Sequence, residues 1–134
     1  MRSHIAHLQY NVRPDNLPYY RDLFGQLGWQ TLHDADGFLG LGGDGPASIW
    51  FAGLANEHVN DYDGPGHNHL GIGVPSQADV DAMATWLTAR GTALLFDTPR
   101  HRPEFAGGDG QTYYQIMFET PDRILVEVVY TGAM

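Results

Sequence analysis

The first half of the chain has the hydrophobic pattern of one strand, one helix and three further strands. Residues 5–12 alternate with a period of two, so that His7, Gln9 and Asn11 share the polar face of the expected strand. A stripe at helical spacing follows and ends at Gly28, a position typical of a C′ glycine. Short strand patterns separated by Asp-Gly and Gly-Gly turns cover residues 29–33, 38–41 and 48–52.

The second half repeats this order after a polar segment rich in Gly and Pro. A strand is expected over residues 69–74, and Ser76 is a candidate N-cap for the helix that follows. Val80, Met83, Ala84 and Leu87 form its apolar stripe, and Arg90-Gly91 ends it. Three more strands are expected over residues 92–96, 112–118 and 124–130.

The two halves can be superimposed along the sequence. A shift of 69 − 7 = 62 places His7 on His69 and matches the apolar positions of the two first strands. The pattern therefore predicts an α+β fold of two βαβββ modules whose curved sheets surround a cavity. We expect the modules at residues 1–54 and 67–134, with a linker at 55–66.

Composition and charge exclude several classes of protein. The formal net charge is −9 and lysine is absent, so the surface would repel a nucleic acid. No apolar run approaches the roughly 18 residues of a membrane span, and the first residues do not form a signal peptide. Cysteine is absent, which leaves His and carboxylates as metal ligands and fits a cytoplasmic protein.

Three residues stand out as candidate metal ligands. His7 and His69 occupy the same position in the first strand of each module, and Glu127 lies in an apolar final strand. A carboxylate buried in such a strand needs a cation, a proton or a hydrogen-bond donor. Two histidines and one carboxylate hold a divalent metal in many proteins. Structural histidines and a Glu at a solvent-facing sheet edge are the alternatives, and His67 is an alternative ligand.

Four segments, in order, resemble the vicinal oxygen chelate superfamily. They are residues 6–12 (AHLQYNV), 19–25 (YYRDLFG), 68–74 (NHLGIGV) and 118–127 (FETPDRILVE). The superfamily includes glyoxalase I, extradiol dioxygenases, fosfomycin-resistance transferases and bleomycin-resistance proteins, and the resemblance covers essentially the whole chain. Thr120 and Arg123 depart from its usual closing turn, where an Asp and a Gly are typical.

The resemblance implies a divalent-metal enzyme that acts on a small carbonyl or diol substrate. The metal would be Ni, Zn, Mn or Fe, held by His7, His69 and Glu127 with no fourth protein ligand near Ser48 and Trp50. Lyase or isomerase chemistry of the glyoxalase type is favoured, because a dioxygenase tyrosine near Met117 and a fosfomycin-type lysine are absent. A ring-cleaving dioxygenase-like member, a metal-free drug-sequestering protein and a metal-binding protein without turnover are the alternatives.

Several further residues are candidates for substrate binding. Gln9 and Asn11 share the face of His7, and Tyr113 and Gln115 could line a cavity or simply pack. The long segment 98–111 is either a lid that brings Arg100 or Arg102 to an anionic substrate or a surface loop. No residue is assigned as the catalytic base. The resemblance also implies a homodimer, in which the modules pair within one chain or are exchanged between two chains.

Overall fold

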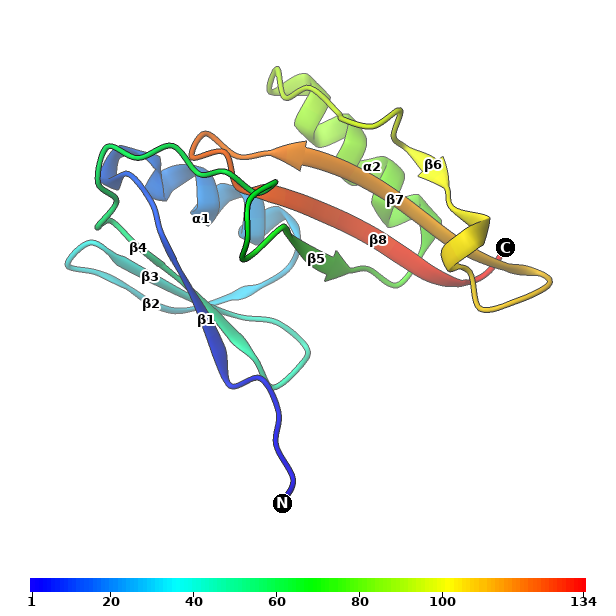
Figure 1. Cartoon of the computed structure of the whole chain (residues 1–134), viewed down its shortest axis with the longest axis horizontal. Helices are drawn as coiled ribbons and strands as arrows, with labels where there is room; N and C mark the ends of the chain where they lie inside the picture. Colours follow the sequence, from blue (N-terminus) through cyan, green and yellow to red (C-terminus); the bar gives the residue numbers. More distant parts are fainter. The chain divides into compact units, whose positions relative to one another are not determined.

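The computed structural model describes all 134 residues and divides into two compact units, Met1–Val59 and Asn60–Met134. Each unit contains one four-stranded sheet and one α-helix, as Figure 1 shows. The first unit consists of β1 (His7–Asn11), η1 (Pro14–Asn16), α1 (Leu17–Gln26), β2 (Gln30–Ala35), β3 (Phe38–Gly42) and β4 (Ser48–Ala52). Its sheet has the order β1-β4-β3-β2, and β1 runs parallel to β4.

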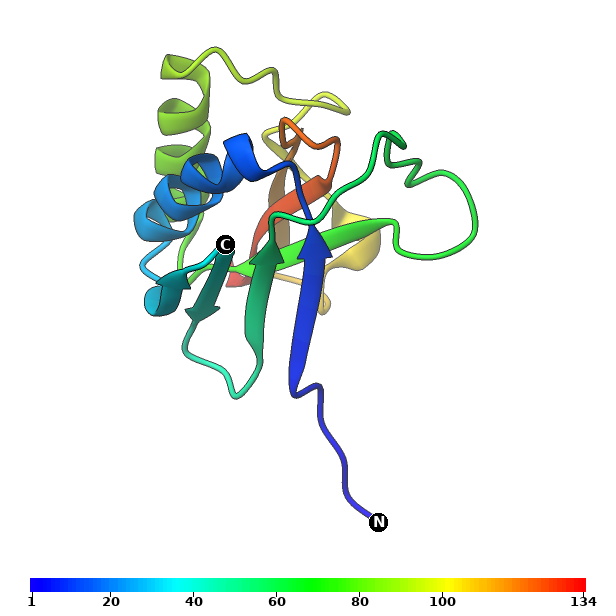
Figure 2. The same cartoon turned by 90° about the vertical axis from the view of Figure 1, so that its left-hand side faces the viewer.

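Aromatic side chains form the core of the first unit. The helix α1 buries Tyr20, Leu23 and Phe24, and the ring of Phe51 from β4 stacks on Tyr20 with 4.2 Å between centroids. Gly28 has a φ of +81°, so the glycine permits the left-handed turn that ends the helix. Before β1 the N-terminal residues extend away from the sheet (Figure 2).

The second unit repeats the same topology. It consists of β5 (His69–Gly73), α2 (Gln77–Ala89), β6 (Arg100–His101), η2 (Pro103–Phe105), β7 (Gln111–Glu119) and β8 (Leu125–Ala133). The order of the sheet is β5-β8-β7-β6, with β5 parallel to β8 and β7 antiparallel to β8. Its first strand, β5, begins 62 residues after the start of β1, as the sequence repeat predicts.

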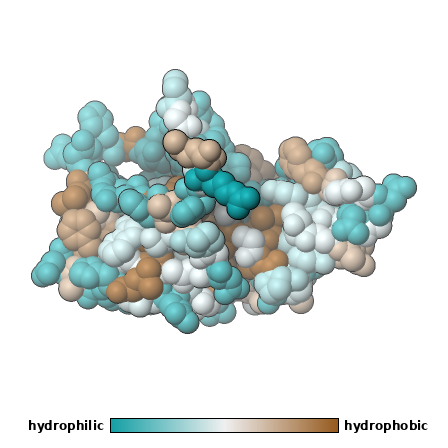
Figure 3. Space-filling view, turned by 90° about the horizontal axis from the view of Figure 1, so that it is seen from below, coloured by the Kyte–Doolittle hydropathy of each residue, from teal (hydrophilic) through white to brown (hydrophobic).

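Aliphatic side chains form most of the core of the second unit. The helix α2 buries Val80, Met83, Ala84 and Leu87 on the side that packs against β7 and β8. Its N-terminus is capped by Ser76, whose hydroxyl accepts a hydrogen bond of 3.1 Å from the backbone of Asp79. None of the chain's helices is long and apolar enough to cross a membrane. In the space-filling view, hydrophobic surface lies in patches between hydrophilic side chains (Figure 3).

The predicted fold class, two βαβββ modules of an α+β protein, is confirmed. One strand was placed wrongly, because residues 92–96 form no strand and the corresponding edge strand is β6. The physical reason lies at Phe96 and Asp97, whose φ angles of 58° and 55° are incompatible with an extended strand. The chain therefore turns after Leu95, whose amide still donates to the carbonyl of Met117 on β7, and the regular pairing with β7 starts at Arg100.

The turn before β8 keeps its geometry despite the unusual residues Thr120 and Arg123. Its backbone closes with a hydrogen bond of 2.9 Å from the amide of Arg123 to the carbonyl of Thr120. Arg123 adopts a φ of 56°, the left-handed conformation for which glycine is preferred. The strand β8 starts two residues after Arg123, at Leu125, and Glu127 is its third residue.

Much of the predicted linker belongs to one unit or the other. The amide of Ala55 donates to the carbonyl of Val12 in the first unit. Asn60 donates to the carbonyl of Arg123 over 2.9 Å, and the Tyr62 hydroxyl donates to Glu119, both in the second unit. Tyr62 also packs with Met117 and Leu125. Residues 55–66 are therefore divided between the two units, with the boundary after Val59.

Candidate functional site

A cavity of about 480 Å³ lies within the second unit, on the face of the sheet that α2 does not cover. Ligand-binding cavities of proteins commonly have volumes of about 300–1,000 Å³. Its wall combines aromatic and apolar side chains with a few polar ones: Tyr62, Asp63, Asn68, His69, Phe96, Arg102, Phe105, Tyr113, Gln115, Met117, Leu125 and Glu127. The cavity brings together five of the six predicted site residues of this unit, namely His69, Arg102, Tyr113, Gln115 and Glu127.

Glu127 is the buried carboxylate of this cavity, with 4% of its surface exposed. On β8 it lies opposite Gly71 of β5 and Met117 of β7. Its Oε1 accepts a hydrogen bond of 2.7 Å from the Tyr113 hydroxyl, and its Oε2 lies 3.2 Å from Nε2 of His69. Two of the three predicted metal ligands are thus neighbours, and one carboxylate oxygen is held by a phenol.

The ring of His69 is oriented by Asn68. The Asn68 amide nitrogen donates to the carbonyl of Tyr62 over 2.8 Å, which fixes the amide with its oxygen toward His69. This oxygen lies 2.7 Å from Nδ1 of His69, so Nδ1 carries the hydrogen. In the neutral imidazole, Nε2 is then the nitrogen with a lone pair, and it faces Glu127.

The facing atoms of His69 and Glu127 suit a shared cation. A lone pair and a carboxylate oxygen repel each other unless a proton or a metal ion joins them. Nε2 of His69 and Oε2 of Glu127, 3.2 Å apart, are an imidazole nitrogen and a carboxylate oxygen, the protein atoms that would hold a divalent cation here. The donor set therefore fits a divalent metal. Within the second unit no third His, Cys, Asp or Glu joins the pair.

Tyr113 connects the carboxylate to the aromatic wall. Burial, and then the hydrogen bond to Glu127, raise the pKa of Tyr113 to about 12, so the phenol stays protonated and donates. The ring of Phe105 meets Tyr113 edge to face with 5.5 Å between centroids, and the guanidinium of Arg102 lies 4.9 Å from the Phe105 ring. The segment between α2 and β7 therefore closes one side of the cavity.

The two arginines predicted on this segment have different positions. Arg102 lines the cavity, although its Nε also donates to Glu104 over 2.6 Å. Arg100 is exposed, lies on the edge strand β6 and does not contribute to the cavity wall. The segment 98–111, which was expected to be a lid or a surface loop, holds a short strand and a 3-10 turn, and it supplies Arg102 and Phe105 to the wall.

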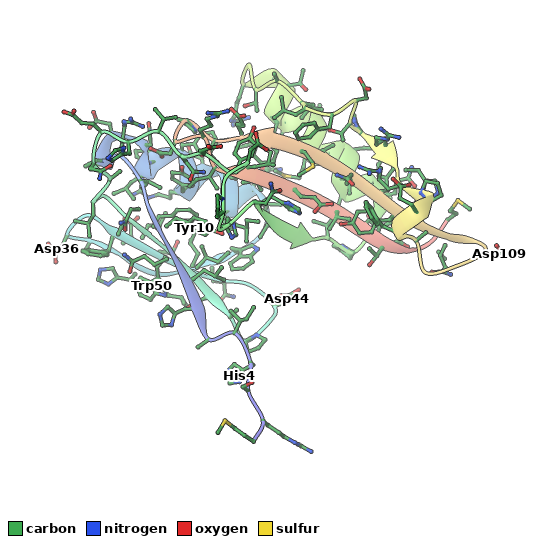
Figure 4. All side chains as sticks on the ribbon, viewed as in Figure 1. His4, Tyr10, Asp36, Asp44, Trp50 and Asp109 are labelled. Carbon is green, nitrogen blue, oxygen red and sulfur yellow. The ribbon has the colours of Figure 1, made fainter.

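The remaining predicted residues lie in the first unit. His7, Gln9 and Asn11 are exposed on one face of β1, and the Gln9 amide donates to Asn11 over 3.1 Å. Their participation in the site stays a prediction. Trp50, labelled in Figure 4, lies opposite Gln9, the same register position that Glu127 has opposite Gly71. The first sheet thus carries an indole where the second carries the carboxylate.

Several residues of the cavity were not singled out from the sequence. Asn68 directly precedes His69, and this adjacency was the available signal for its orienting role. Tyr62 and Asp63 were assigned to the linker, and Phe96 to a strand that does not form. Acidic side chains such as Asp36, Asp44 and Asp109 lie at turns (Figure 4). These carboxylates account for part of the negative charge without forming a site.

Comparison with known proteins identifies the fold. No family model matches the chain. The chain is 47% identical over 64 residues to the uncharacterized protein YqjT of Bacillus subtilis (strain 168). The match covers 48% of this chain and 46% of that protein, so it spans about half the length of either.

Solved structures match over nearly the whole chain. A candidate glyoxalase from Bacillus halodurans superimposes with a TM-score of 0.78 at 24% identity and covers 96% of both chains. A glyoxalase/bleomycin resistance protein from Albidiferax ferrireducens gives a TM-score of 0.71 at 16% identity, over 97% of this chain and 100% of that one. FosX from Listeria monocytogenes, solved with Mn(II) and sulfate, gives 0.70 at 17%, over 98% and 93%. These matches establish a shared fold.

Proposed function

We propose that this chain, which has the fold of the glyoxalase, bleomycin-resistance and dioxygenase proteins of the vicinal oxygen chelate superfamily, is a divalent-metal-dependent enzyme. Its substrate is a small molecule with a carbonyl or adjacent oxygens, and its chemistry is of the lyase or isomerase type. The proposed metal ligands are His7, His69 and Glu127. The observation that carries the proposal is the buried Glu127, whose Oε2 faces Nε2 of His69 at 3.2 Å in the wall of a cavity.

The surroundings of the pair support a metal more than a simple ion pair. Asn68 and Tyr113 fix the two groups from outside, the arrangement that orients the ligands of metal sites in other proteins. FosX, which shares the fold, was solved with Mn(II). The second unit supplies only two ligands, so the site requires a further one. We propose His7 for this role, from the same chain or from a second copy.

The chain's own residues would bind and orient the substrate beside this pair. A divalent cation bound there would polarise a substrate oxygen and stabilise the negative charge that develops on it. Gln115 and Arg102 line the cavity and can hold polar groups of the substrate, while the aromatic wall excludes water. Tyr113 keeps its proton and holds Oε1 of Glu127, so Oε2 remains the oxygen directed at His69. Gln9 and Asn11 stay candidate contacts.

A metal-free binding protein is the second candidate, because the cavity alone has the size and the aromatic lining of a drug-binding site. Metal titration distinguishes the two. Metal-free protein should bind one Ni, Zn, Mn or Fe ion per chain in calorimetry, and His69→Ala, Glu127→Gln and His7→Ala should each weaken binding at least 100-fold. Glu104→Gln, an exposed carboxylate outside the cavity, is the control. Equal metal affinity in all variants would refute the metal site.

We further propose that the protein is a cytoplasmic homodimer. A site whose second unit holds only two ligands can take the third from a neighbouring chain. Light scattering at micromolar concentration should give twice the mass of one chain. A monomer that still binds one metal ion per chain would contradict the dimer and leave the metal site intact.

A further inference from the structure

Gln115 is a polar residue of the cavity whose side chain takes no part in the pair of His69 and Glu127. Gln115 has 3% of its surface exposed, lines the cavity and makes no hydrogen bond to another group of the protein through its side chain. It lies on β7 between Tyr113 and Met117, which also line the cavity, whereas Tyr114 points to the opposite face and bonds to Asp81 of α2. The amide is therefore directed into the cavity.

An amide in such surroundings selects its partner by chemistry. Its NH₂ group donates and its oxygen accepts, so both must be satisfied when a ligand displaces solvent. A carboxylate can satisfy only the NH₂ group and leaves the amide oxygen facing negative charge. An apolar group satisfies neither. A ligand group that both donates and accepts, such as a carboxamide, a lactam or a hydroxyl, satisfies both.

The register places Gln115 and Glu127 on the same face of the sheet. Gln115 lies opposite Val129, and Met117 lies opposite Glu127, so Gln115 and Glu127 are diagonal neighbours on one face of the sheet. Diagonal neighbours in an antiparallel pair are separated by about 7–8 Å between their Cα atoms. Aromatic rings of Tyr62, Phe96, Phe105 and Tyr113 line the cavity around this span. Such walls favour a flat, apolar ligand body.

From this placement we infer that the ligand is a flat, unsaturated or aromatic molecule with two polar ends. One end carries the oxygens that meet His69 and Glu127, and the other carries an uncharged group that donates to and accepts from Gln115. Gln115 is thus the residue that selects neutral over anionic substrates. This inference rests on the proposed function for the chemistry at the first end, and it adds the substrate class.

Three catechols that differ only in the group para to one hydroxyl test it: carboxamide, carboxylate and methyl. Their adjacent hydroxyls suit the His69–Glu127 end. Calorimetry with metal-loaded protein should rank the carboxamide first, about tenfold tighter than the methyl compound, which corresponds to about 1.4 kcal/mol for the added hydrogen bonds. Gln115→Leu should reduce this ratio to about one, and Gln115→Glu should weaken the carboxylate further. Tyr114→Phe, on the opposite face, should preserve the ranking.

The outcomes separate this inference from the metal site. Equal affinities for the three probes, or a preference for the carboxylate, would overturn the inference, while metal binding could stand. A preference for the carboxamide that persists in Gln115→Leu would also overturn it. If the protein binds no metal but still prefers the carboxamide, and this preference depends on Gln115, the inference is supported and the proposed metal-dependent enzyme is refuted. If Gln115→Leu does not fold, the ranking in the natural protein and in Gln115→Glu decides.

Discussion

The two sheets have the same topology, and the first strand of each pairs with the last strand in the same register. They differ at one position of that last strand, the residue that lies opposite the central residue of the first strand. In the second unit this position holds Glu127, a buried residue that accepts a hydrogen bond from Tyr113 and lies beside His69. In the first unit it holds Trp50, whose ring lies so close to Gly40 that a Cβ there would be 2.6 Å from it. Its indole donates to Ser48 within the same strand. The same module can therefore use one register position for packing or for polar chemistry.

The hydrophobic cores of the two units differ in the kind of side chain that fills them. The first unit packs its helix against the sheet with the aromatic rings of Tyr20, Phe24 and Phe51. The second uses mainly aliphatic side chains from α2 and β8 together with the buried ring of Phe118, and four of its aromatic residues line the cavity: Tyr62, Phe96, Phe105 and Tyr113. The comparison teaches that the first unit places its aromatic rings between helix and sheet, whereas the second also places four of them in the wall of a cavity. Four predictions test this division, from the largest expected effect to the smallest.

Removal of a core ring from the first unit should have the largest effect. Phe51→Ala deletes a fully buried ring stacked on Tyr20, and such truncations cost about 3–5 kcal/mol. Urea denaturation followed by circular dichroism measures the free energy of unfolding. Leu32→Ala, at an exposed position of β2, is the control and should change it by less than about 0.5 kcal/mol. A loss below about 1 kcal/mol for Phe51→Ala would contradict an aromatic core that supports this unit.

Tyr113→Phe should act on metal binding in the second unit. The substitution removes the hydrogen bond to Oε1 of Glu127 and leaves the ring in place, and loss of such an outer partner typically weakens metal binding about 10–100-fold. Calorimetric titration with Mn(II) or Zn(II) measures the effect. Tyr130→Phe loses only a bond to the backbone of Ala133 and is the matched control. Identical affinities for the two variants would show that Tyr113 does not position the carboxylate.

The two helix N-termini give a smaller, paired test. Ser76 caps α2 with its side chain, whereas Asn16 precedes α1 without a side-chain cap bond. Ser76→Ala should therefore cost about 1 kcal/mol of unfolding free energy, and Asn16→Ala much less. Thermal denaturation of the two variants side by side measures the difference. Equal losses would refute the assignment of the caps.

The tyrosines should show the smallest effect, at high pH. Burial raises the pKa of Tyr10 and Tyr19 in the first unit to about 12, and burial together with a carboxylate acceptor does the same for Tyr113. The folded protein retains these protons where the unfolded chain loses them, so this stability is complete below about pH 10 and is lost as the pH rises through about 12. Absorbance titration should show that Glu127→Gln lowers the pKa of Tyr113 and leaves that of Tyr10 unchanged.

The sequence predicted the repeat and the fold because alternation, caps and glycines are local signals. Gly28, Ser76 and Gly91 end or begin the helices where the pattern indicated. The edge strand was misplaced because left-handed conformations at Phe96 and Asp97 leave no mark in hydropathy.

For the site, pairing of His69 with Glu127 followed from the repeat and from a charge in an apolar strand. The roles of Asn68 and Tyr62 depend on contacts between distant segments, which no local pattern reveals. Arg100 and Arg102 were equivalent in sequence, and only the pairing of β6 with β7 separates them. The role of His7 as a metal ligand remains a prediction.

Ala55 forms a hydrogen bond within the first unit and Asn60 forms one within the second, so the chain passes from one unit to the other between these two residues. Five peptide links from residue 55 to residue 60 bridge at most about 18 Å. If two copies exchange their first modules, residues 55 and 60 of each chain must stay within this distance of each other. A longer separation requires that Asn60 and Tyr62 detach from the second sheet. The length of this segment therefore limits how far apart the two modules of one chain can lie in an arrangement that exchanges them between two copies.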